Sequence, residues 1–98
     1  MFMPVLKKDE SYRIMYNLLL GEVKEVEEAI MQYRITGSPK HRDELVGEIW
    51  DVIQICIGLL DKAEKEGANI EDSNMKHLMK LINRQKWVFE KMIKAEVI

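Results

Sequence analysis

The sequence is short of cysteine, of excess charge and of long hydrophobic runs, and each shortage excludes a class of protein. Cys56 is the only cysteine, so the chain has neither a disulfide framework nor a cysteine-based zinc site. The longest apolar run, Ile55 to Leu60, is far shorter than the roughly 20 residues that span a bilayer. The N-terminal MFMPVLKK becomes charged too early for a secretory signal. We therefore expect a cytoplasmic protein.

Charge and size point to a small globular protein. The formal net charge is −2, which gives no general signal for nucleic-acid binding, although basic residues gather late in the chain. Hydrophobic residues make up 47% of the sequence and charged residues 33%, as in a folded globular protein. We expect the 98 residues to form one domain, which at this size buries about 60–65% of its unfolded surface.

Apolar residues recur at the helical period along the chain, with no alternation typical of strands. We expect three helices, over about residues 9–35, 39–66 and 69–95. Gly37 and Gly67 are suited to end the first two helices, and Ser38-Pro39 to open the second. Gly21 marks either a bend or a break in the first helix. The predicted fold class is all-α, a bundle of three to four helices.

The second helix has more apolar surface than an edge helix needs. Its apolar residues cover well over half of its circumference, whereas a stripe of about 100° is enough for a helix packed on one side. The excess favours cover from a second subunit. We therefore expect a homodimer or a homotetramer, in which dimerisation completes a four-helix bundle.

Two pairs of carboxylates stand out, Glu22 with Glu25 and Glu48 with Asp51. Each pair has i, i+3 spacing, which places both acids on one side of a helix. Two like charges about 5 Å apart repel by roughly 3 kcal/mol at an effective dielectric constant of 20. No lysine or arginine lies between Leu45 and Leu60 to neutralise the second pair.

A divalent cation held by all four acids would remove this repulsion, and all-oxygen ligation suits Mg²⁺ or Mn²⁺. Two alternatives stay open: the first pair as part of a solvated acidic face, and ion pairing of the second pair with the basic third helix. A di-iron centre is disfavoured because neither His41 nor His77 has a glutamate three residues before it.

The order ExxE then ExxD resembles the metal signature of the MazG-like, all-α nucleotide pyrophosphohydrolases. Here 22 residues separate Glu25 from Glu48, and the surrounding EVKEVEEAI and ELVGEIWDVIQI are also similar to that family. A third segment, HLMKLINRQKW, looks like the family's basic helix, whose lysine and arginine would be Lys80 and Arg84. The similarity extends from about Leu18 to Trp87.

The resemblance implies Mg²⁺-dependent hydrolysis of a nucleoside triphosphate, often a deoxy or non-standard one, to the monophosphate and pyrophosphate. It implies metal ligation by Glu22, Glu25, Glu48 and Asp51, phosphate binding by Lys80 and Arg84, and a site shared between subunits. Glu25 or Glu48 would activate the attacking water. Trp50 and Trp87 either stack on the base or pack in the core or an interface. The competing hypothesis is a non-catalytic helical interaction module.

Overall fold

The computed structural model describes residues 4–5 and 11–83. They contain three helices, α1 (Tyr12–Thr36), α2 (Pro39–Lys65) and α3 (Ile70–Asn83), and no strand. The predicted all-α class is confirmed for these residues. The chain divides into two compact units, one of residues Pro4–Asp61 and one that includes Lys62 onward, and each is considered by itself. The expected continuation of the third helix to Ala95 lies outside the described residues.

Helix α1 begins and ends at residues whose side chain or backbone suits a cap. The Ser11 hydroxyl accepts a hydrogen bond from the Ile14 backbone N–H, so the helix starts three residues later than the sequence analysis placed it. The helix continues through Gly21 without a break. It ends as predicted at Gly37, which has a left-handed φ of 61° and donates its N–H to the Tyr33 carbonyl at 2.7 Å.

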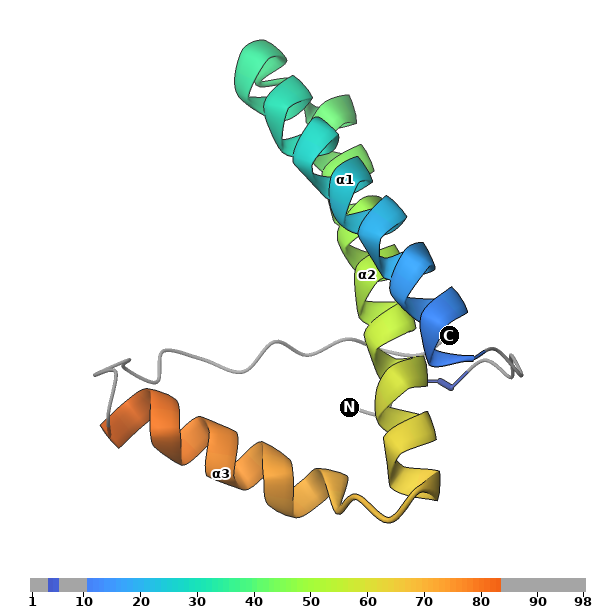
Figure 1. Cartoon of the computed structure of the whole chain (residues 1–98). Helices are drawn as coiled ribbons and strands as arrows, with labels where there is room; N and C mark the ends of the chain where they lie inside the picture. Colours follow the sequence, from blue (N-terminus) through green and yellow to red (C-terminus); the bar gives the residue numbers. More distant parts are fainter. Residues whose placement is uncertain (1–3, 6–10, 84–98) are drawn as a thin grey trace. The chain divides into compact units, whose positions relative to one another are not determined.

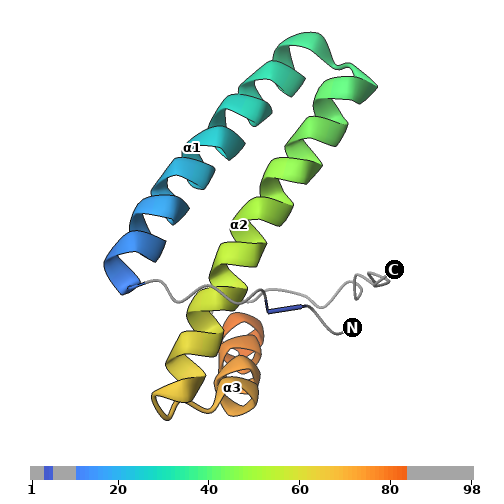
Figure 2. The ribbon, with the colours of Figure 1, turned by 90° about the vertical axis from the view of Figure 1, so that its right-hand side faces the viewer.

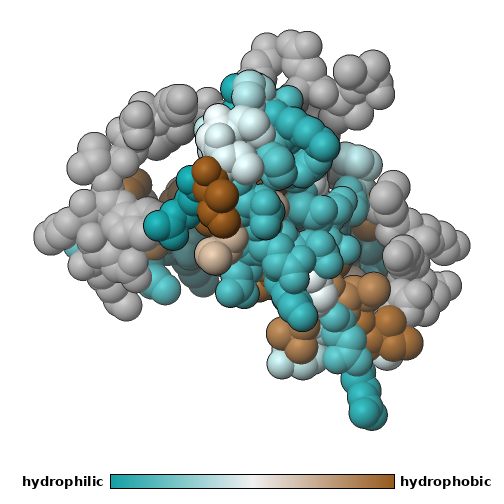
Figure 3. Space-filling view, turned by 90° about the horizontal axis from the view of Figure 1, so that it is seen from above, coloured by the Kyte–Doolittle hydropathy of each residue, from teal (hydrophilic) through white to brown (hydrophobic). Residues whose placement is uncertain are grey.

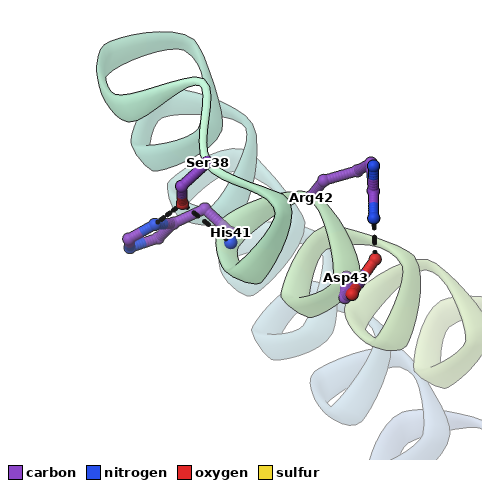
Figure 4. A network of polar contacts seen from close by, with 4 residues as sticks. All are labelled: Ser38, His41, Arg42 and Asp43. Carbon is purple, nitrogen blue, oxygen red and sulfur yellow. Dashed lines mark hydrogen bonds and ion pairs between the residues drawn. The ribbon is translucent and has the colours of Figure 1, made fainter.

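A polar network fixes the turn between α1 and α2. The Ser38 hydroxyl accepts the His41 backbone N–H at 3.2 Å, which makes Ser38 the N-cap of α2, and Pro39 occupies the first helical position. The His41 ring Nδ1 lies 2.7 Å from the Ser38 hydroxyl (Figure 4). The same ring nitrogen lies 3.1 Å from the Thr36 hydroxyl. The predicted opening of the second helix is confirmed, and His41 is a capping residue.

Helices α1 and α2 form an antiparallel hairpin, lying side by side in both views (Figures 1 and 2). The residues of α1 with the least exposed side chains are spaced 4-3-4-3-4, the pattern of a helix seam: Met15, Leu19, Glu22, Val26, Ala29 and Tyr33. On α2 the half-buried residues that continue the same 4-3-4-3-4 spacing are His41, Leu45, Glu48, Val52, Ile55 and Leu59, the last three within a stretch that is half-buried throughout, residues 52–59. These two rows, which we call the seam, hold the hairpin together.

The core of the hairpin is small. Met15, with 8% of its surface exposed, is the only buried residue among those described. Its terminal methyl lies 3.0 Å from the position that a Cβ on Gly58 would take, so the missing side chain lets the two helices approach there. Many apolar side chains remain exposed, and the space-filling view in Figure 3 shows brown hydrophobic patches between teal hydrophilic ones. No described helix is both long enough and apolar enough to cross a membrane.

Helix α3 follows a second glycine stop. Gly67 has a φ of 107° and closes the turn after α2, as predicted. The Asn69 side chain accepts the Asp72 backbone N–H at 3.0 Å and so caps α3. Lys76 and Asp72 form an ion pair at 3.0 Å across one turn.

The two glycines of α1 give a matched test of this fold. Gly37→Ala should destabilise the protein by about 1–2 kcal/mol, because alanine is strained in the left-handed conformation. Gly21→Ala should stabilise it by up to about 1 kcal/mol, because that position is helical and a Cβ there meets open space. Urea unfolding of both variants at one protein concentration measures the two effects. Equal signs would contradict the assigned helix end.

Candidate metal centre

The site is built on two acids that occupy positions in the seam. Glu22 on α1 and Glu48 on α2 are both half-buried, in rows whose other members are mostly apolar. Because the hairpin is antiparallel and its turn is short, residues at similar distances from the turn lie opposite one another. Glu22 lies 15 residues before Gly37 and Glu48 lies 11 residues after it, so the two are offset by about one turn, and Asp51 lies nearer to the level of Glu22. The fold of a single chain thus brings the three side chains together.

Three carboxylates meet at this point. One oxygen from each of Glu22, Glu48 and Asp51 lies within 4.8 Å of the others. Asp51 is exposed, because it lies one turn beyond Glu48 and beside the seam. Glu25 is also exposed and is not one of these three, although its charge acts on Glu48. The predicted group of four is thus represented by three residues in close contact and Glu25 beside them.

The arrangement disfavours negative charge on Glu48. Loss of water around the half-buried side chain raises the pKa of the Glu48 carboxyl above its ordinary value of 4.5. The charges of Asp51, Glu22 and Glu25 raise the pKa further, as does a hydrogen bond between the Glu48 and Glu22 side chains. Negative charge at this point is therefore unfavourable unless Glu48 keeps its proton or a cation binds.

No basic side chain of the hairpin is seen to pair with these carboxylates in the described residues of Pro4–Asp61. The salt bridge in that unit between Arg42 and Asp43 does not involve the cluster. Ion pairing with the basic third helix stays an open alternative. Carboxylate oxygens at this spacing are the ligands that Mg²⁺ and Mn²⁺ prefer.

Comparison with protein-family models decides the family. The model of the MazG nucleotide pyrophosphohydrolase domain matches residues 10–89 of the 98. The chain belongs to the MazG family. No curated protein and no solved structure matches the sequence. Family membership suggests a nucleotide pyrophosphohydrolase activity and agrees with an all-helical fold.

The remaining residues predicted for this MazG domain are placed only in part. Lys80 is exposed in the last turn of α3, whereas Arg84 and Trp87 lie outside the described residues. Trp50 is 42% exposed on α2, so it is not a core residue of the hairpin. The roles of Lys80 and Arg84 in phosphate binding stay predictions.

The sequence analysis left open whether Glu22 belongs to a solvated acidic face. The structure places it within the seam, in the same row as Met15 and Tyr33. The 4-3-4-3-4 spacing through Leu19, Glu22 and Val26 was the signal that could have shown this.

In the absence of metal, we expect the free energy of unfolding of this MazG domain to decrease with rising pH through the Glu48 carboxyl. Below about pH 4.5 Glu48 is protonated in both the folded and the unfolded chain, so the fold does not bear the cost of a charged Glu48 and the free energy of unfolding is at its highest with respect to this group. As the pH rises through the raised pKa of Glu48 in the folded state, the free energy of unfolding decreases, because the folded chain must then hold a charged Glu48. We expect Glu48→Gln to remove this loss and to raise the melting temperature near neutral pH.

Thermal unfolding in a chelator, followed from acid to neutral pH, measures the effect. Glu28→Gln is the control, because Glu28 is exposed and lies outside the cluster. A melting temperature of Glu48→Gln below that of the unaltered protein at neutral pH would contradict the assignment.

Proposed function

We propose that this protein is a Mg²⁺-dependent nucleoside triphosphate pyrophosphohydrolase that releases pyrophosphate and a nucleoside monophosphate. Its substrates would be deoxy or non-standard nucleotides, removed in a cytoplasmic house-cleaning role. The observation that carries the proposal is the cluster of Glu22, Glu48 and Asp51 in a MazG domain, which has no basic partner among the described residues of its own helical hairpin.

The donor set fits a hard divalent ion. Ligand oxygens around an ion with Mg²⁺–oxygen bonds of 2.0–2.1 Å lie at most about 4 Å apart. The three oxygens lie within 4.8 Å of one another, so side-chain rotation of less than about 1 Å brings them to such a spacing. Glu22, Glu48 and Asp51 would hold the ion, with Glu25 as a fourth ligand. A bound Mg²⁺ supplies positive charge that polarises phosphate oxygens.

The protein side chains would perform the remaining steps. Water attacks a phosphorus of the α–β anhydride, and the bond from that phosphorus to the bridging oxygen breaks, giving the monophosphate and pyrophosphate. Glu25 or Glu48 would take the proton from the attacking water. Glu25 is exposed and lies beside the cluster of three, which leaves it free to contact water. Glu48 lies within the cluster, next to the proposed ion. Lys80 and Arg84 would bind phosphate oxygens through charge-assisted hydrogen bonds.

A second candidate function is a non-catalytic helical module. The extent of exposed apolar surface on α1 and α2 favours it, because such surfaces bind partner helices. A module of this kind needs no metal. Metal binding and pyrophosphate release therefore distinguish the two candidates.

Metal binding should stabilise the native protein. Millimolar Mg²⁺ should raise the melting temperature, since a ligand that binds only the folded state at 100 times its dissociation constant adds about 2.7 kcal/mol. Glu48→Gln and Asp51→Asn should lose this response, and Glu28→Gln should keep it. An unaltered protein whose melting temperature ignores both Mg²⁺ and Mn²⁺ would contradict the metal site.

Activity should follow the same residues. We expect pyrophosphate release from at least one member of a panel of standard and modified nucleoside triphosphates. Glu48→Gln should lower the rate by about 10²-fold or more, the range typical of losing a group that positions charge or moves a proton. Release that persists without divalent metal, or that Glu48→Gln leaves unchanged, would reject the proposed mechanism.

The phosphate-binding role of Lys80 has a matched control one turn away. Lys80→Ala should raise KM for the triphosphate by about 10-fold, as expected for losing a charged contact to phosphate. Lys76→Ala should change KM little, because Lys76 is paired with Asp72 on the same helix. Steady-state kinetics on both variants measures the difference, and equal KM values would remove Lys80 from the substrate site.

A further inference from the structure

Four neighbouring residues on the surface of helix α2 include one acid of the cluster. They are joined by i, i+3 and i, i+4 spacings, at which side chains on a helix lie next to one another. We call them the α2 patch: Gly47, Trp50, Asp51 and Gln54. All four belong to the unit that also holds the cluster, so the α2 patch extends directly from the proposed metal site.

Trp50 stands beside a position that has no side chain. Its own side chain is 42% exposed, and a Cβ added at Gly47, three residues earlier, would meet open space. Long side chains on a helix lean toward its N-terminus, so the Trp50 ring leans toward the turn that contains Gly47. A flat ring could therefore lie on the face of Trp50 without displacing another side chain. Nucleobases stack on tryptophan in this way, whatever their sequence of donors and acceptors.

The Gln54 side chain is held in one orientation by a distant part of the chain. It is half-buried, and its Nε2 donates a hydrogen bond to the Pro4 carbonyl at 2.9 Å. A carbonyl oxygen only accepts, so the amide nitrogen must be the atom that faces Pro4. Neither the amide oxygen nor the second N–H of Gln54 has a hydrogen-bond partner among the described residues. Gln54 thus presents an acceptor beside a donor, the pattern that pairs with the edge of a nucleobase.

Asp51 connects this surface to the cluster. One of its carboxylate oxygens lies with those of Glu22 and Glu48, and Gln54 follows it by one turn on the same helix. A nucleotide has the matching order, with charged phosphates at one end and a flat, hydrogen-bonding base at the other. Phosphates at the cluster would therefore place the base over the α2 patch.

We propose, building on the proposed function, that the α2 patch binds the nucleobase of the substrate. Trp50 stacks on the base over the open surface at Gly47, and the Gln54 amide forms hydrogen bonds to the edge of the base. Stacking strengthens the binding of every nucleotide, whereas the fixed donor and acceptor of Gln54 distinguish one base from another. Gln54 is then the specificity-determining residue.

Binding of the four deoxynucleoside monophosphates, measured by calorimetry with Mg²⁺, tests these roles without turnover. Deoxyribose 5-phosphate, which lacks a base, should bind the unaltered protein at least about 10-fold more weakly than the preferred nucleotide. Trp50→Ala should weaken all four nucleotides by about 10-fold or more, as expected for loss of a stacking partner. Gln54→Met should bring the four dissociation constants together. A merely structural role of Gln54 would weaken all four equally and keep their ratios.

Two glycines provide a matched pair of variants. Gly47→Leu should fill the space beside Trp50 and weaken nucleotide binding by about 10-fold or more. Gly21→Leu is the control, because Gly21 is also helical and open, and it precedes Glu25 by one turn as Gly47 precedes Asp51. Lys24 stands there in place of an aromatic residue, so binding should be unchanged. Leucine favours a helix more than glycine, so loss of the helix would not explain a difference.

Each other outcome separates this proposal from the proposed function. An unaltered protein that binds no nucleotide, or binds deoxyribose 5-phosphate equally well, would overturn the base site. Trp50→Ala that changes the mass in sedimentation but not the nucleotide affinity would place Trp50 in an interface and overturn it too. Pyrophosphate release that needs Glu48 but keeps its kcat/KM for every triphosphate in Gln54→Met and Trp50→Ala would reject the base site alone. The expected binding without any release would support the base site and reject the proposed function.

Discussion

The main constraint on this structure is the repulsion between two carboxylates that lie in the seam of its helical hairpin. Glu22 and Glu48 occupy positions where apolar side chains would stabilise the contact between α1 and α2. Their neighbour Asp51 adds a third charge, and the result is a raised pKa for Glu48 rather than an ion pair. A hairpin with one buried residue among those described gains little from its core, so this repulsion is a large cost at its centre. Either a proton retained by Glu48 or a bound cation would lower this cost.

The turn between the helices determines which residues meet. Gly37 ends α1 in the left-handed conformation, and Ser38 caps α2 at once, so the chain reverses within two residues. The bonds from His41 to the Ser38 and Thr36 hydroxyls hold that reversal in one geometry. With the turn fixed, Glu22 lies about four turns from the end of α1 and Glu48 about two and a half turns from the start of α2, so their side chains meet diagonally across the seam. One added residue in the turn would shift and rotate one row against the other, and the cluster would be lost although every carboxylate remained.

The sequence was sufficient for most of the fold and for half of the site. The helix ends could be predicted without knowledge of the fold, because each capping residue acts through its own backbone conformation or a local side-chain hydrogen bond. These residues are Gly37, Ser38, Gly67 and Asn69. The acidic pair Glu48 and Asp51 stood out because no basic residue follows it for a long stretch. The position of Glu22 in the seam was harder to predict, because a helical wheel drawn around the apolar residues of α1 assigns a charged residue to the edge of the apolar face. The start of α1 at Ser11 was missed because Asp9 is an equally good cap by residue type.

The hairpin carries two kinds of surface, one acidic and one apolar. On one side of the hairpin, acids from both helices converge, and their repulsion lowers the stability of the fold unless a cation binds. Apolar residues of both helices also stay exposed to water, which lowers stability unless they are covered. Both surfaces share the helix α2, because Glu48 and Ile53 are only five residues apart on the same rigid cylinder. Burial of the apolar surface would restrain α2 along most of its length and so hold Glu48 and Asp51 in place against their mutual repulsion.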